Sequence, residues 1–265
     1  MSYPINYPTP QGANVQIFRG GDSTTASVFN TLTKDWVKPQ GASFVWFTLI
    51  GAGGGGGGGN GVPGAYYGGG GASGNVTNFM CPAFLIPDVL QISIGRGGYG
   101  GTANLGGDGD NGAGGSNTIV YYQQKNTLGY QLLVASGGNG GVGGSTSGGN
   151  QGSGGSSNGT DSGGPMTAAG FYNSIANQAG ANGSSFQTIS GTTFVMSGSG
   201  LNNGTAISGY YGYTAANGYS QLSPIPNCIS GGGVGSRPSP FGCGGNGDYT
   251  NGCQGGDGLA IIVTW

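Results

Sequence analysis

The first stretch with the spacing of a chemical site is TLIGAGGGGGGGNG, at residues 48–61. Gly51, Gly53 and Gly56 fit the Gly-x-Gly-x-x-Gly fingerprint of dinucleotide-binding turns. In such folds the turn opens a helix that binds the pyrophosphate, and an acidic residue about 20 positions later binds the ribose. Here seven consecutive glycines begin at Gly53 and disfavour a helix by about 1 kcal/mol each, and the next carboxylate is Asp88. We therefore expect no nucleotide cofactor.

Side chains for acid–base and nucleophilic chemistry are scarce. The chain has no His and no Glu, so Ser-His-Asp and Cys-His sites, His-ligated zinc and Glu-based acid–base pairs each lack a required member. The eight acidic residues are all Asp, most of them isolated between glycines. A working aspartate pair needs a rigid, partly apolar scaffold that separates the two pKa values. We expect that the protein is not an enzyme, and we assign no catalytic residue.

One acidic stretch has a spacing that could suit a metal ion. GGDGDNGAGG, at residues 106–115, places Asp108, Asp110 and Asn111 close together and resembles one calcium-binding nonapeptide repeat. A single near-copy cannot build the repeated structure, however, and calcium takes six to eight oxygen ligands. We interpret the stretch as a solvated turn and expect no metal site.

The cysteines leave three alternatives open. Cys81, Cys228, Cys243 and Cys253 include no C-x-x-C motif, which disfavours a four-cysteine zinc site. Cys243 and Cys253 flank a short glycine-rich loop, a spacing that allows them to pair in oxidising surroundings. Free buried thiols, one or two late-formed disulfides, and a metal site all remain possible readings of the sequence.

Composition places the chain between order and disorder. It has 67 Gly and 12 Pro in 265 residues, which is typical of low-complexity or disordered chains. Disorder also favours a high net charge, but this chain has a net charge of −2 and carries 3 Trp, 14 Tyr and 10 Phe. Something must therefore order the glycines, because fixing a glycine backbone costs more entropy than fixing any other.

Charge and hydropathy also exclude partners. The six Lys and Arg residues are scattered along the chain, so we expect no binding to nucleic acid. No apolar run approaches 18 residues, and the N-terminus has neither a basic segment nor a continuous apolar one, so we expect no membrane insertion and no secretory signal.

Short β-branched and aromatic runs of strand length separate the glycine tracts. No amphipathic helical pattern of useful length occurs. We expect strands at Asn14–Phe18, Phe44–Ile50, Leu90–Ile94, Thr118–Tyr122, Gln131–Ala135, Thr193–Met196 and Leu259–Trp265.

The glycines themselves recur every third residue. Three series show this period: Gly68, Gly71, Gly74; Gly97, Gly100, Gly106, Gly109, Gly112, Gly115; and Gly137, Gly140, Gly143, Gly149, Gly152, Gly155. Three residues per turn is the period of the polyproline II helix, and glycine along one edge lets neighbouring backbones approach closely. Collagen is disfavoured because the repeat is interrupted and Pro is scarce in the tracts. Flexible linkers are the alternative, although linkers seldom contain aromatic residues.

These patterns predict an all-β, partly irregular fold with essentially no α-helix. In it, short strands combine with packed polyglycine II helices.

The two ends of the glycine-rich part resemble a known family. WVKPQGASFVWFTLIGAGGGGGGG (36–59) resembles the opening of the glycine-rich domain of bacteriophage tail-fibre and related virion proteins, and GGDGLAIIVTW (255–265) resembles its close. Between them the chain is similar to the distal adhesins of T-even-like phages, which pack polyglycine II helices into a sandwich and present receptor-binding loops at its ends. The resemblance covers residues 36–265, where it implies a glycine-rich β/polyglycine domain. Residues 1–35 do not resemble the attachment domain of such an adhesin, and we interpret them as an N-terminal extended or attachment segment.

The resemblance implies a non-enzymatic virion protein, assembled in the host cytoplasm, that acts as a tail-fibre or spike adhesin. Its partners would be other virion proteins, fibre or capsid subunits, and a host-surface protein or glycan. The alternative is a purely structural capsid or fibre cement, or a minor capsid protein, that contacts neighbouring subunits. An ice-binding role needs a flat Thr/Ala face, which the Asn, Val, Ser and Gln residues between the glycines do not provide.

Two islands without long glycine runs, FYNSIANQ (171–178) and GYYGYTAANGYSQ (209–221), concentrate aromatic residues. Tyrosine offers rigid contact area with a hydrogen-bonding tip, which suits the recognition of sugars or proteins. The same rings could instead cap glycine helices or fill a small core. Our candidate receptor-binding residues are Phe171, Tyr172, Tyr210, Tyr211, Tyr213 and Tyr219.

Overall fold

The structure is a computed structural model that describes part of the 265-residue chain. The described residues are 13–20, 32–60, 68–72, 74–122, 130–145, 171–175, 251–252 and 254–265. The strand expected at Thr193–Met196 lies outside them.

The described chain is all-β, as the sequence predicted. Its only helix is a short 3-10 helix, η1, at Ala83–Leu85. The strands are β1 (Asn14–Arg19), β2 (Leu32–Val37), β3 (Phe44–Ile50), β4 (Val76–Pro82), β5 (Val89–Ile94), β6 (Thr118–Tyr122), β7 (Tyr130–Ala135), β8 (Phe171–Ile175) and β9 (Leu259–Thr264).

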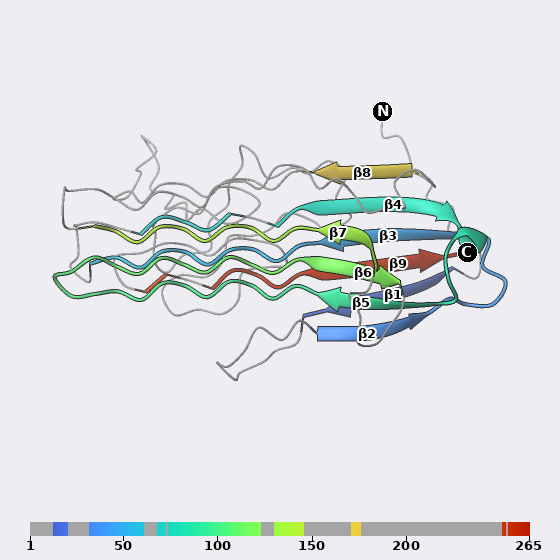
Figure 1. The fold of residues 1–265 in the computed structure, drawn as a ribbon, viewed down its shortest axis with the longest axis horizontal. Coiled ribbons are helices and arrows are strands. Elements are labelled where there is room, and N and C mark those ends of the chain that lie inside the picture. Colours follow the sequence, from blue (N-terminus) through green and yellow to red (C-terminus); the bar gives the residue numbers. More distant parts are fainter. Residues whose placement is uncertain are drawn as a thin grey trace, which may run out of the picture.

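The strands form two antiparallel sheets. One has the order β1-β9-β3-β4-β8 and the other the order β2-β5-β6-β7 (Figure 1). In the first sheet Phe47 pairs with Phe79 on one side and with Ile262 on the other, which places three apolar side chains in one row. Such rows form because alternate residues of a strand face the same side of a sheet.

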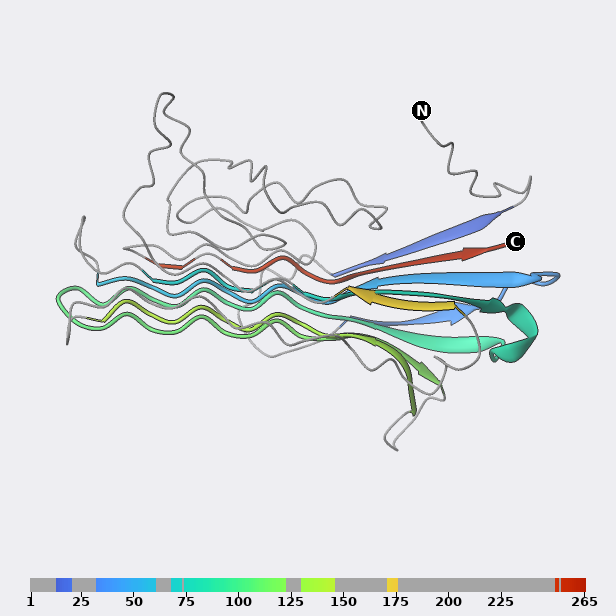
Figure 2. The same ribbon diagram turned by 90° about the horizontal axis from the view of Figure 1, so that it is seen from above.

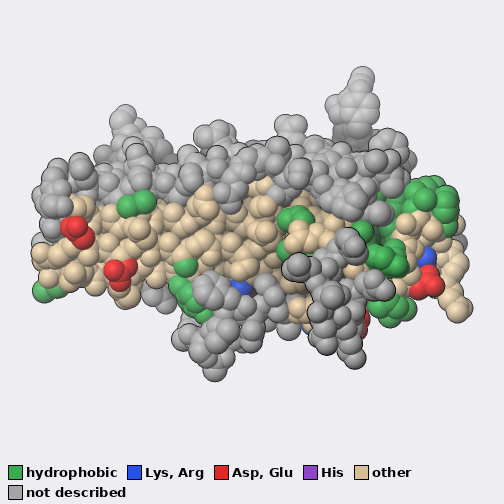
Figure 3. All heavy atoms as spheres, viewed as in Figure 1, with side chains coloured by type: hydrophobic (Ala, Val, Ile, Leu, Met, Phe, Trp, Pro, Cys, Tyr) green, Lys and Arg blue, Asp and Glu red, His purple; other side chains and the backbone are tan. Residues whose placement is uncertain are grey.

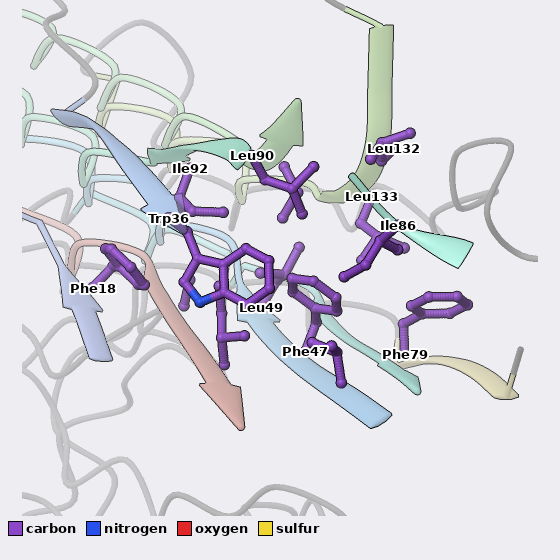
Figure 4. Packing of buried hydrophobic residues seen from close by; sticks show 14 of the residues in the cluster. Phe18, Trp36, Phe47, Leu49, Phe79, Ile86, Leu90, Ile92, Leu132 and Leu133 are labelled. Carbon is purple, nitrogen blue, oxygen red and sulfur yellow. The ribbon is translucent and has the colours of Figure 1, made fainter. Parts of the chain in front are cut away.

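A core of apolar side chains lies between the two sheets (Figure 4). Trp36 of β2 meets Phe47 of β3 edge-on, with ring centroids 5.9 Å apart, and both side chains are almost completely buried. The larger members of this core include Phe18, Trp36, Phe47, Leu49, Phe79, Leu90, Ile92, Ile94, Leu133 and Ile262. The two sheets are therefore a β-sandwich, held together by ordinary hydrophobic burial.

The six predicted strands that lie among the described residues are confirmed to within a residue at each end, but the sequence analysis missed β2, β4 and β8. In β2, which has the sequence LTKDWV and lies at the edge of its sheet, Trp36 is deeply buried but its polar neighbours are exposed. These polar residues gave the sequence little resemblance to a strand. β4 contains Asn78 and ends at Pro82, both of which weaken a strand signal. β1 lies inside the segment 1–35 and pairs with β9 along its whole length, so this part of the segment belongs to the sandwich.

Beyond one end of the sandwich the strands continue as glycine tracts that run side by side (Figures 1 and 2). β3 leads into the tract at 51–60, which we call the central tract. Its backbone N–H groups bond to carbonyls of other tracts at every third residue: Gly51 to Asn75, Gly54 to Ala72 and Gly57 to Gly69, at 2.7–2.9 Å. Three residues per turn is therefore the geometry of the tract, as the glycine period predicted.

Within the described residues, five glycine tracts surround the central one. They comprise the described residues of the ranges 68–75, 95–104, 107–116, 136–144 and 251–258, and we call them together with the central tract the glycine bundle. The 68–75, 107–116 and 251–258 tracts accept hydrogen bonds from the central tract, and the 95–104 and 136–144 tracts donate to it. Neighbouring outer tracts also bond to each other with the same period, for example Gly109 and Gly112 to Gly144 and Gly141.

The tracts lie so close together that most glycines have no room for a side chain. A methyl group on Gly55 would lie 1.9 Å from the carbonyl oxygen of Tyr99, and one on Gly140 would lie 2.0 Å from that of Gly112. The sequence period is confirmed in three tracts, whose packed edges are Gly68, Gly71, Gly74; Gly109, Gly112, Gly115; and Gly137, Gly140, Gly143. For these tracts, packed glycine helices and not linkers are the correct interpretation.

Candidate recognition surface

The end of the bundle that points away from the sandwich carries a well-defined turn between the 95–104 and 107–116 tracts (Figure 1). The Gly107 N–H donates to the Asn104 carbonyl at 3.0 Å, which closes the turn. Gly106 adopts φ +76°, a left-handed conformation that glycine reaches without a steric penalty. The sequence Asn-Leu-Gly-Gly therefore folds locally into a reversal of the chain.

The turn is fixed to the end of the central tract. The Asn104 and Gly106 N–H groups donate to the carbonyls of Gly59 and Asn60, at 3.2 and 3.0 Å. Between them the side chain of Leu105 is 84% exposed. A rigid backbone thus holds an apolar side chain in solvent at the tip of the bundle.

Polar side chains next to this turn bond within the bundle. The Ser145 hydroxyl donates to Asp108 Oδ1 at 3.1 Å, and the Thr102 hydroxyl donates to Asp110. The Gly143 N–H donates to Asn111 Oδ1 at 2.8 Å. The acidic stretch therefore forms the hydrogen-bonded turn and the beginning of the 107–116 tract. Among the described residues, no group of three or more acidic or cysteine side chains is suited to a metal ion.

A second surface feature lies on the side of the bundle. The Arg96 guanidinium lies over the ring of Tyr99, 5.0 Å from its centroid, which is a cation–π contact. A shallow depression beside them is lined by these two residues, Ala113, Ser116 and glycine backbone. It offers a planar ring and backbone polar groups, but no acid–base pair.

Cys81, on β4, is a free thiol with its side chain in the sandwich core. Burial raises its pKa to about 11, against a smaller opposing effect of the Lys38 charge. The thiol is therefore protonated at neutral pH, which makes it a poor nucleophile. Of the three alternatives for the cysteines, the free buried thiol is correct for Cys81, and the other three cysteines lie outside the described residues.

The candidate receptor-binding residues fall in two groups. Phe171 and Tyr172 lie in β8, at the edge of its sheet, where they pair with Met80 and Phe79 of β4. The structure describes the backbone of these two residues but not their side chains. The other four candidates, Tyr210, Tyr211, Tyr213 and Tyr219, lie outside the described residues.

The sequence interpretation did not single out Leu105. The sequence did contain one signal for it. Leu105 lies in a short stretch without glycine, which also contains Ala103, where the three-residue glycine period of 97–115 is interrupted.

The fold and its surface define a class of protein: a β-sandwich whose strands continue into a hydrogen-bonded bundle of glycine tracts. The chain belongs to the family described as a glycine-rich domain, which it matches over residues 25–265. A comparison with curated proteins found no match. In the described part of the chain, no helix is long and apolar enough to cross a membrane.

Proposed function

We propose that the protein is a non-enzymatic virion structural protein, a tail-fibre or spike adhesin. It would recognise a host-cell protein or glycan through loops held by the glycine bundle. Adhesion is the whole mechanism: the bundle positions the loops, and the loops make the contacts.

The observation that carries this proposal is the rigid turn at the tip of the bundle. Hydrogen bonds from Asn104 and Gly106 to the central tract fix the turn, and Leu105 stands exposed on it. A loop that is ordered before binding loses little conformational entropy when it meets its partner. The bundle behind it has few reactive side chains, which suits a support and not a catalyst.

The sequence resemblance to phage adhesins supports the same function, because those proteins present recognition loops at the ends of packed glycine helices. Of the aromatic candidates, Phe171 and Tyr172 lie at the edge of the sandwich and not at the tip, so they would form a separate contact. The candidates at 210–219 would belong to further recognition loops. Each single contact would be weak, and many copies on one particle would raise the overall affinity through avidity.

The test is binding of purified protein to susceptible cells, compared between Leu105→Asp and Gly114→Ala. Leu105→Asp places a charge at the tip, and we expect it to weaken binding at least about tenfold, or about 1.4 kcal/mol. Gly114→Ala is the control, because its methyl group meets nothing closer than 3.6 Å on the side of the bundle. The Tyr211→Ala, Tyr213→Ala double variant tests the aromatic candidates in the same assay. Full binding by both Leu105→Asp and this double variant would contradict the proposal.

The alternative is a purely structural capsid or fibre protein that contacts neighbouring subunits. The observation that favours it is the exposed apolar end of the sandwich, where Phe84 is 83% exposed. Two results separate the functions: free protein that binds cells supports the adhesin, and loops that are all protected from proteolysis inside a particle support the structural role.

A further inference from the structure

The end of the sandwich opposite the glycine bundle carries exposed apolar side chains. Figure 3 shows hydrophobic side chains gathered at that end of the molecule. Five residues contribute, with exposed fractions of 83% for Phe84, 60% for Val37, 50% for Val89, 42% for Leu85 and 40% for Phe44. We call these five residues the apolar end.

The members of the apolar end are neighbours through the backbone. Val37 pairs with Val89 across β2 and β5, at the last and first residues of these strands. The chain then crosses from one sheet to the other through 83–88, and the Ala83 N–H donates to the Ser43 carbonyl next to Phe44, at 2.8 Å. The five side chains therefore form one surface that spans the end of both sheets.

A lysine holds this surface rigid. Lys38 Nζ donates to the carbonyls of Ala83 and Ile86, at 3.0 and 2.9 Å, and forms an ion pair with Asp88 at 2.8 Å. These contacts fix both ends of η1, so that Phe84 and Leu85 stay in solvent and do not fold back onto the core. An ordered apolar surface loses little entropy on binding, which favours association.

Charge does not oppose contact between two copies of this surface. Lys38 and Asp88, beside this surface, form an ion pair, and the whole chain has a net charge of only −2. Low net charge favours self-association because long-range repulsion is weak.

We propose that two copies of this chain associate end to end through the apolar end. An aromatic side chain contributes about 150–250 Å², so the five partly exposed residues supply on the order of 400–500 Å² per copy. Two copies then bury about 1,000 Å², which is the lower limit for a specific interface and corresponds to a weak, reversible dimer. In this arrangement the two bundle tips point in opposite directions. The proposal does not depend on the recognition function.

The test is sedimentation equilibrium of the full chain from about 10 µM to 1 mM, combined with small-angle X-ray scattering. We expect a monomer–dimer equilibrium with a dissociation constant in the micromolar range, and a maximum dimension that roughly doubles on dimerisation. Phe84→Asp should raise the dissociation constant at least about tenfold. Leu105→Asp is the matched control: it removes an equally exposed apolar side chain at the opposite end, and it should leave the dissociation constant unchanged.

Three results would overturn the proposal. One is a wild-type chain that stays monomeric at about 1 mM. This result would count against the dimer even if the apolar end bound another protein or uncharged lipid vesicles. Another is a dimer that Leu105→Asp weakens as much as Phe84→Asp does. The third is a dimer whose maximum dimension stays near that of the monomer, since this would mean side-by-side association. Far-UV circular dichroism of each variant verifies that the fold is intact.

Discussion

The sandwich and the glycine bundle are built from the same chain segments, yet different parts of the residue hold them together. In the sandwich, Trp36, Phe47 and Phe79 exclude water from the space between two sheets. In the bundle, Gly54 and Gly57 bond through backbone groups alone, and a side chain at these positions would collide with the next tract. Burial of apolar side chains stabilises the sandwich. Backbone hydrogen bonds stabilise the bundle, and they form because its glycines have no side chains to keep the tracts apart.

The difference follows from the directions in which the backbone groups point. A strand directs its N–H and C=O groups to two sides, so it has two neighbours and two faces left for side chains. A helix with three residues per turn directs them to all sides, and the central tract accordingly bonds to five neighbours among the described residues. The central tract therefore makes hydrogen bonds to more neighbours than a strand does, but it leaves no room for side chains.

The largest expected effect tests this contrast in the bundle. Gly55→Ala adds one methyl group 1.9 Å from the Tyr99 carbonyl oxygen, and neither backbone can move without breaking bonds to other tracts. We expect a loss of more than about 4 kcal/mol, or failure to fold. Urea unfolding followed by tryptophan fluorescence measures it, and a variant as stable as the wild type would show that the tracts are not packed as described.

In the sandwich the response to substitution should instead be graded. Phe47→Ala leaves a cavity in the core and should cost about 3–5 kcal/mol, whereas Phe47→Leu should cost about 1 kcal/mol. The same unfolding measurement applies to both variants. Equal losses for Ala and Leu would contradict a core that responds to volume.

A buried hydroxyl group makes two hydrogen bonds at the junction of the two regions. Thr118 Oγ1 is buried, donates to the Ile50 carbonyl at 2.7 Å and accepts from the Gly95 N–H at 3.1 Å, where strands become glycine tracts. Thr118→Val keeps the shape but removes both of these buried hydrogen bonds, and we expect a loss of about 2 kcal/mol. Thr33→Val, on the exposed face of edge strand β2, is the control and should change stability by less than about 0.5 kcal/mol.

A pH-dependent effect is expected in the sandwich. Burial raises the pKa of Cys81 from 9.0 to about 11, so the thiol stabilises the fold fully below pH 9 and loses this contribution as pH rises toward 11. Relative to Cys81→Ala, the wild type should lose about 1 kcal/mol of stability between pH 8 and pH 10. A difference between the two proteins that stays constant over this range would contradict a buried, protonated thiol.

The smallest effect sharpens the comparison inside one tract. A methyl group on Gly114 would lie 3.6 Å from the Gly138 carbonyl oxygen, an ordinary contact, whereas one on Gly112 would lie 2.2 Å from that of Gly55. We expect Gly114→Ala to change stability by less than about 0.5 kcal/mol and Gly112→Ala to unfold the protein. Similar stabilities for the two variants, measured by thermal unfolding, would remove the distinction between the packed and open edges of the tract.

Sequence patterns predicted most strands and the glycine helices, because both depend on local periods. They missed β2, β4 and β8, whose places in the sheets depend on partners far along the chain. These partners are β5, β3 and β4, in that order. They did not predict the rigid tip around Leu105, because its order comes from hydrogen bonds to Gly59 and Asn60. The aromatic candidates at 210–219 stay a prediction.

The sequence by itself determined that glycine recurs every third residue and that apolar strands lead into these tracts. The tertiary structure decided which tracts are neighbours and which tract is surrounded by the others. The physical reason is that a glycine helix presents similar backbone donors and acceptors on all sides, so its sequence contains no information about its partners. That information comes from the strands: side-chain burial in the sandwich fixes the order of β9, β3 and β4, and the tracts that continue from them inherit it.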